Sequence, residues 1–233
     1  MDVKVIIMVI DSMGISFRLL KYSFAFKINV VCASVLLFLG LVLECANLYE
    51  GQSFRVGCVY VELAGLFPAQ IWFVLPAFRV MAASPWHKKA HTFIPGMLVA
   101  ICGLACFTLL VLTKLIFMLA RGINPAFISG AILLQAVSFC FLAIYFGVAY
   151  KHYVAATLLF GLTFLPFLML LMRDMSGNLP QALYLLLNNV PLSILLGYVI
   201  FAVGVAIGFL LLQLLSKKEI STWALGPRLR NQI

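Results

Sequence analysis

Two ionisable side chains lie inside long apolar runs of the sequence. A charge in such surroundings is usually functional. They are Glu62 and Lys114, and we place both toward the outer ends of their runs. A charged group within lipid is costly, so it normally lines a substrate path or pairs with an opposite charge. We expect Glu62 to line a substrate path. Pairing with Lys114 or Arg55, or outward snorkelling of both side chains at the interface, are the alternatives.

Three uncharged polar side chains also fall within apolar runs: Gln70, Gln135 and Ser138. Inside lipid such groups most often form hydrogen bonds between helices. Contact with a transported substrate is the second interpretation. In that case Gln70 and Gln135 would line the substrate path together with Glu62.

The remaining reactive residue types form no pattern typical of an enzyme or a metal site. The sequence has no G-x-x-x-x-G-K-[ST] phosphate loop, no H-E-x-x-H and no G-x-S-x-G on a strand-to-helix turn. His87 and His91 share a helix face, but no cysteine or carboxylate accompanies them, so we expect a basic loop and no metal. Cys45 and Cys58 flank one connection, and a disulfide between them stays open. We therefore expect no enzymatic activity in this chain.

The strongest local signal is a short basic segment between two apolar runs. It reads Ser84, Pro85, Trp86, His87, Lys88 and Lys89. Serine is a good N-cap and proline fits the first turn of a helix, so a short helix is expected here. A basic helix held between two spans is a suitable docking point for another protein. A solvated, lipid-facing loop is the alternative.

Composition decides which elements must position these residues. The 233 residues are 65% hydrophobic and only 10% charged, whereas soluble domains have about 45–50% apolar and about 25% charged residues. A soluble domain and a disordered chain are both excluded, and the solvent must be a lipid bilayer. The net charge of +9 fits basic residues facing anionic lipid, not nucleic acid.

Six apolar runs are long enough to be membrane spans, and lipid requires them to be helices. They cover residues 28–43 (closed by Glu44), 56–78, 94–119, 126–150, 154–172 and 192–215. We predict an all-α integral membrane protein with one transmembrane domain over residues 1–233. Residues 1–27 form a cytoplasmic interfacial segment, 28–215 the six spans and 216–233 a cytoplasmic tail. Between the fifth and sixth spans, residues 173–191 contain a short apolar helix that re-enters the outer leaflet.

The basic residues predict the orientation. With the N-terminus inside, twelve of the 16 Lys and Arg residues fall on the cytoplasmic side, and Lys114 snorkels outward. The outer set is Arg55, Arg121 and Arg173. This asymmetry predicts a multi-pass plasma-membrane protein with both termini in the cytoplasm.

This layout resembles the membrane subunit of ABC-2-type ABC transporters. The matching parts are the interfacial segment 12–27, the connection 79–92 as a coupling helix, and the re-entrant segment 173–191. The resemblance implies a translocation path formed by a homodimer or by a heterodimer with a related chain. It also implies a separate ATP-binding cassette ATPase that carries ATP and Mg and docks on residues 84–89. The expected activity is export of a hydrophobic or amphipathic substrate.

Two other classes remain open. A substrate-binding membrane subunit of a vitamin or ion importer would show a polar pocket built from several spans. An intramembrane enzyme would need paired catalytic side chains at mid-membrane, and the inner halves of these spans offer no such pair.

Overall fold

The computed structural model describes residues 24–50, 57–65, 93–149, 152, 154–163 and 189–215. All regular structure in these ranges is helical, as predicted. The long helices are α2 (Phe24–Glu50), α6 (Phe93–Arg121), α7 (Pro125–Ala149) and α10 (Val190–Leu214). Two short helices, at residues 57–65 and Val154–Thr163, complete the described fold.

Four described helices are long and apolar enough to cross a membrane. Their apolar segments have 24 to 26 residues, which at 1.5 Å per residue gives about 36–39 Å, more than the ~30 Å of a hydrocarbon core. They coincide with the predicted runs 28–43, 94–119, 126–150 and 192–215. The chain is therefore a membrane protein.

The other two predicted spans are described only in part. The 57–65 helix lies within the predicted run 56–78, and the Val154–Thr163 helix begins the predicted run 154–172. The interfacial segment before residue 24, the re-entrant segment and the basic segment 84–89 lie outside the described residues.

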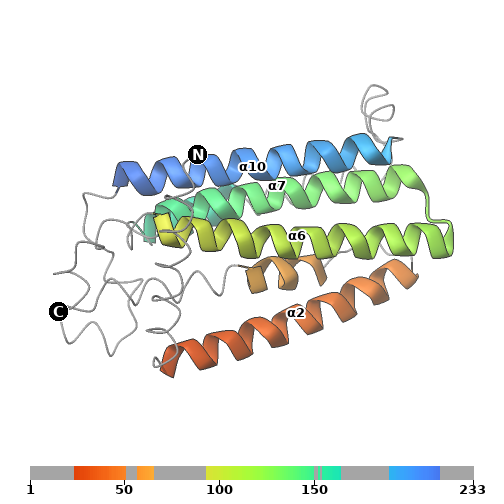
Figure 1. Cartoon of the computed structure of the whole chain (residues 1–233), viewed down its shortest axis with the longest axis horizontal. Helices are drawn as coiled ribbons and strands as arrows, with labels where there is room; N and C mark the ends of the chain where they lie inside the picture. The colour runs from red at the N-terminus through yellow and green to blue at the C-terminus, as the bar shows by residue number, and fades with distance from the viewer. Residues whose placement is uncertain are drawn as a thin grey trace, which may run out of the picture.

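The long helices lie side by side in a bundle (Figure 1). In the view of Figure 1, α10 lies above α7, α6 lies below α7, and the 57–65 helix separates α6 from α2. α2 and α6 run in one direction, whereas α7 and α10 run in the other. The start of α6 and the end of α10 therefore lie at the end of the bundle where α2 begins.

A tight turn at residues 122–124 reverses the chain between α6 and α7. Gly122 has a φ of 65°, a left-handed conformation that favours glycine. The Asn124 side chain then accepts a hydrogen bond of 2.9 Å from the Ala126 amide at the start of α7. At the same end, the Arg121 guanidinium lies 3.9 Å from the centre of the Tyr49 ring, which joins the ends of α6 and α2.

The helix α7 packs closely against α10 through glycines. A Cβ atom on Gly204 would lie 2.5 Å from the Cα atom of Cys140, and one on Gly208 would lie 2.6 Å from the Ala143 carbonyl oxygen. The spacing of these two glycines predicts close helix packing, either within the chain or across a dimer. The structure uses them within the chain.

An aromatic cluster fills the centre of the bundle. Phe107 of α6 is fully buried. Its ring contacts Phe139 of α7 at 5.7 Å and Tyr198 and Phe201 of α10 at 5.1 and 6.0 Å between ring centres. These contacts hold α6, α7 and α10 together as the rigid part of the fold.

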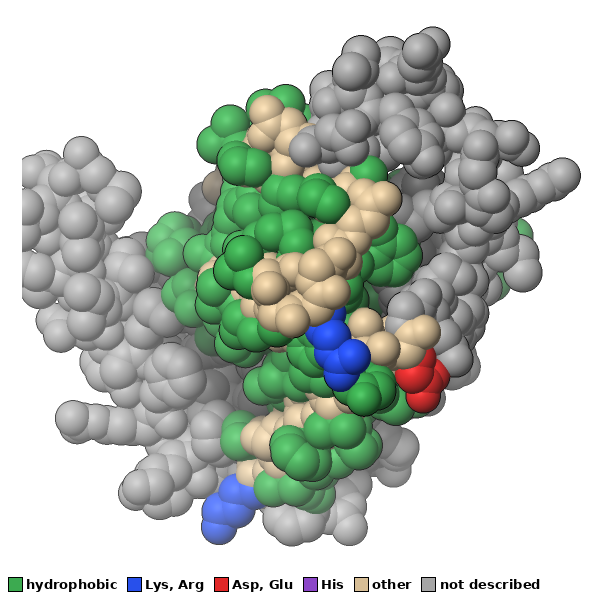
Figure 2. All heavy atoms as spheres, turned by 90° about the vertical axis from the view of Figure 1, so that its right-hand side faces the viewer, with side chains coloured by type: hydrophobic (Ala, Val, Ile, Leu, Met, Phe, Trp, Pro, Cys, Tyr) green, Lys and Arg blue, Asp and Glu red, His purple; other side chains and the backbone are tan. Residues whose placement is uncertain are grey.

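The outer helices expose apolar faces. In the most apolar 18-residue stretch of each helix, 11% of the residues are buried in α2 and 22% in α10, against 61% in α7. α7 is therefore the central helix. Exposed side chains recur every three or four residues along α10: Leu195, Val199, Val203, Ile207, Leu210 and Leu214. Figure 2 shows that hydrophobic side chains also cover much of the described end face with the 122–124 turn. The apolar faces along the sides of α2 and α10 suit contact with lipid.

Candidate functional site

The described bundle buries a small group of polar side chains in an otherwise apolar interior. We define the polar cluster as Glu44, Glu62, Lys114, Gln135 and Ser138, which are between 0% and 3% exposed. Its members come from α2, the 57–65 helix, α6 and α7. Glu62 lies within electrostatic range of both Lys114 and Glu44, so the members form one site.

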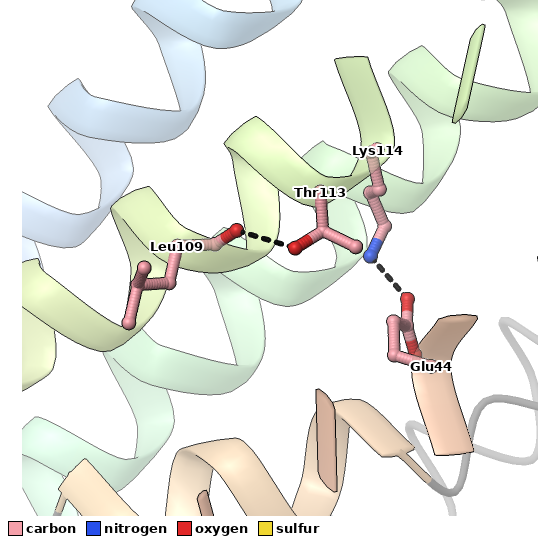
Figure 3. Close-up of polar contacts among 4 residues, drawn as sticks. All are labelled: Glu44, Leu109, Thr113 and Lys114. Carbon is pink, nitrogen blue, oxygen red and sulfur yellow. Dashed lines mark hydrogen bonds and ion pairs between the residues drawn. The ribbon is translucent and has the colours of Figure 1, made fainter. Parts of the chain in front are cut away.

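A buried ion pair connects α2 and α6. The Lys114 ammonium donates a hydrogen bond to Oε1 of Glu44, and both side chains are almost completely buried. Figure 3 shows Lys114 pointing from α6 toward the Glu44 carboxyl group on α2. The neighbouring Thr113 hydroxyl donates to the Leu109 carbonyl oxygen at 2.9 Å, within its own helix.

This pair corrects two sequence predictions. Lys114 does not snorkel outward, because a carboxylate lies within reach inside the bundle and satisfies the ammonium there. Its partner is Glu44, not Glu62. Glu44 was expected to close the first span, but α2 continues to Glu50, so this carboxylate lies inside the helix.

Glu62 reaches the middle of the bundle. Its Oε2 atom accepts a hydrogen bond of 2.5 Å from the Ser138 hydroxyl. Ser138 lies just past the midpoint of α7, so the Glu62 carboxyl group lies deeper than the outer position expected from the sequence. The hydrogen bond joins two helices, which confirms the predicted interhelical role of Ser138.

Glycines bring α2 and the 57–65 helix close enough to place both carboxylates in one site. A Cβ atom on Gly40 would lie 2.8 Å from the Val61 amide nitrogen and 2.9 Å from the Gly57 carbonyl oxygen. The two backbones therefore touch, and any larger residue at Gly40 would force them apart. This contact fixes the position of Glu62 relative to Glu44.

Gln135 is buried without the hydrogen bonds that its amide needs. It is 1% exposed, and neither its Oε1 nor its Nε2 atom has a hydrogen-bond partner among the described residues. The amide lies beside the Cys58 thiol of the 57–65 helix, a weak hydrogen-bonding partner on a neighbouring helix, in keeping with the interhelical role predicted for Gln135. Glu44 Oε2 is likewise buried without a described partner. Each unsatisfied group costs about 1–3 kcal/mol, so the site has capacity for a polar ligand or water.

A small hollow lies on the apolar side of Glu62. Its lining includes Glu62, Gly65, Gly103, Phe139, Ala143 and Phe201, and Glu62 is the one charged side chain among the described residues that line it. It encloses about 10 Å³, close to the ~10–15 Å³ that one water needs.

The other predicted site residues divide into two groups. Gln70, Arg55 and the coupling residues Ser84, Pro85, Trp86, His87, Lys88 and Lys89 lie outside the described residues. Cys45 and Cys58 are described, and no disulfide joins them. The described part of the chain contains no group of three His, Cys, Asp or Glu side chains able to hold a metal.

Sequence reasoning missed Glu44. A signal was available, since Glu44 and Lys114 have opposite charges and lie near the outer ends of two predicted spans that run in the same direction. Charges at equal depth on such helices can meet across an interface.

No family model, curated protein or solved structure matches this chain.

Proposed function

We propose that the chain is the permease subunit of an ABC-2-type transporter. In this role it forms the translocation path as a dimer in the plasma membrane, with six spans and both termini in the cytoplasm. A separate ATP-binding cassette ATPase, which carries ATP and Mg, supplies the energy. The exported substrate is hydrophobic or amphipathic.

The direction of the described helices is the observation that supports this proposal most. α2 and α6 begin, and α7 and α10 end, at the same end of the bundle (Figure 1). The connection that carries residues 84–89 enters α6 at that end, which the basic residues assign to the cytoplasm. A coupling helix for a cytoplasmic ATPase has to lie there.

Co-purification tests the proposal. The tagged chain, expressed in its native cell, should bring along a P-loop ATPase. Changing Trp86, Lys88 and Lys89 together to alanine should release that ATPase. The matched control changes Lys217 and Lys218 of the cytoplasmic tail to alanine and should retain it. Retention after the triple change, with transport intact, would reject the coupling assignment.

The polar cluster favours one second candidate, the substrate-binding membrane subunit of a vitamin or ion importer. Such a subunit needs a polar pocket built from several spans, and the cluster draws on α2, the 57–65 helix, α6 and α7. Cross-linking in native membranes separates the two. A trapped dimer supports the permease, whereas a strictly monomeric chain supports the importer subunit.

A further inference from the structure

We infer that Glu62 is a proton-binding site in the middle of the bundle and that it is protonated in the described arrangement. This inference concerns the chain itself and does not depend on the identity of any ATPase partner.

The charges of the polar cluster do not balance without a proton. Among the described residues, Lys114 pairs with Glu44 and is the only cation near Glu62, which leaves Glu62 as a second carboxylate beside one ammonium. A net negative charge in apolar surroundings costs several kcal/mol, and the usual response is neutralisation. One proton on Glu62 makes the cluster neutral.

The groups that face Glu62 support the neutral acid. Glu44 on α2 and Lys114 on α6 neutralise each other, and α7 contributes Ser138 as a single hydrogen-bond donor. The Cys106 thiol of α6 packs beside the 57–65 helix at Gly65, and Cys58 lies on the same helix as Glu62. From α10, the described contact across the hollow is the Phe201 ring. A carboxylate would be poorly solvated here.

A metal cation fits this position less well than a proton. Hard cations need several oxygen ligands around one point. Among the described residues, the oxygen ligands that this position offers a cation are the two carboxyl oxygens of Glu62 and the Ser138 hydroxyl. The hollow beside Glu62 holds about one water, and its other lining residues are apolar or glycine.

Proton release from this site follows a simple balance. The O–H bond of Glu62 breaks, a water entering the hollow takes the proton as hydronium, and the carboxylate keeps its hydrogen bond from Ser138. Glu44 Oε2, which is buried and has no hydrogen-bond partner among the described residues, is an acceptor for a further water.

Chemical labelling tests the protonation directly. The full-length chain is placed in phosphatidylcholine nanodiscs and treated with dicyclohexylcarbodiimide, which modifies protonated carboxyl groups in apolar surroundings. Mass spectrometry then identifies the modified residue. Glu62 should be labelled, whereas Glu44, whose Oε1 atom is held by the Lys114 ammonium, should remain unlabelled. Labelling should fall about tenfold for each pH unit above the titration midpoint.

Two variants sharpen the test. Ser138→Ala removes the donor that stabilises the carboxylate, so labelling should persist to higher pH. Ser129→Ala is the matched control, because Ser129 is a fully buried serine on the same helix whose hydroxyl has no described partner, and its labelling curve should not move. An infrared band of a protonated carboxyl group should also disappear in Glu62→Gln.

Three results would overturn the inference. They are absence of Glu62 labelling at about pH 6 in a folded protein, labelling that does not change with pH, and protection by sodium ions at constant pH, which would indicate a metal cation instead. The two proposals fail separately, since labelling needs no ATPase and the co-purification experiment does not depend on Glu62.

Discussion

The ion pair between Glu44 and Lys114 provides the most direct test of how the bundle is held together. Both partners are buried, with side-chain exposures of 1% and 0%. We consider three variants: Lys114→Met, Glu44→Met and the double change. Methionine matches the length of both side chains and adds no polar group.

The magnitude follows from what each variant leaves behind. Lys114→Met leaves a buried carboxylate without its cation, and breaking a buried pair in this way costs about 3–5 kcal/mol. A charge at a helix centre in a membrane costs about 2.5–3.5 kcal/mol, so we expect about 3 kcal/mol, or more than about a hundredfold in the folded-to-unfolded ratio. The double variant removes both charges and should lie within about 1 kcal/mol of the natural protein.

The assay is equilibrium unfolding in mixed micelles with an increasing fraction of denaturing detergent, followed by circular dichroism. The control is Thr113→Val, because Thr113 neighbours Lys114 but bonds only within its own helix. It should change stability by less than about 0.5 kcal/mol. A double variant as unstable as the sum of the single variants would refute the reasoning, since additive losses mean that the two groups do not interact.

Two further predictions test the packing and the topology. Gly204→Val should strongly destabilise the bundle, because its Cβ atom would lie 2.5 Å from Cys140 Cα. Gly161→Ala should be neutral or stabilising by about 0.5–1 kcal/mol, because no described atom from another part of the chain lies within 4 Å of the added Cβ. Thermal unfolding in detergent compares the two variants, and equal effects would contradict the close packing. For the topology, a cysteine is placed at Ile123 in a background free of the native cysteines. It should react with a membrane-impermeant maleimide added outside intact cells, and a reporter fused after Ile233 should be found in the cytoplasm. The opposite pattern would reverse the orientation.

Apolar runs were sufficient to predict the long helices. Lipid leaves a polar backbone no alternative to the helix, so a run of about 20 apolar residues already determines its secondary structure. The start of the last span was placed closely, at residue 192, and α10 begins two residues earlier at Val190. The Asn189 side chain caps it, because it accepts a hydrogen bond of 3.2 Å from the Leu192 amide at the first turn of α10.

The partners of the buried charges could not be predicted in the same way. A hydropathy pattern treats a charged residue as an interruption, so Glu44 was taken as the end of a span, although α2 continues past it. Whether Lys114 snorkels or pairs depends on what the neighbouring helix presents at the same depth, which is a tertiary property. The surroundings of the Gln135 amide follow from the same limit, because polarity alone does not say that the Cys58 thiol lies opposite it.

The placement of charge in this bundle argues for more than structural support. Two of the seven acidic residues of the chain lie buried in one site. If the Glu44–Lys114 pair served only to join α2 to α6, apolar residues of similar size would do so at lower cost, since replacing a buried pair with apolar side chains is often neutral or stabilising. One ammonium also balances only one of the two carboxylates. The second carboxylate, Glu62, therefore needs a reason of its own, and a proton that it can hold and release is the simplest ligand that its apolar surroundings and single serine donor allow.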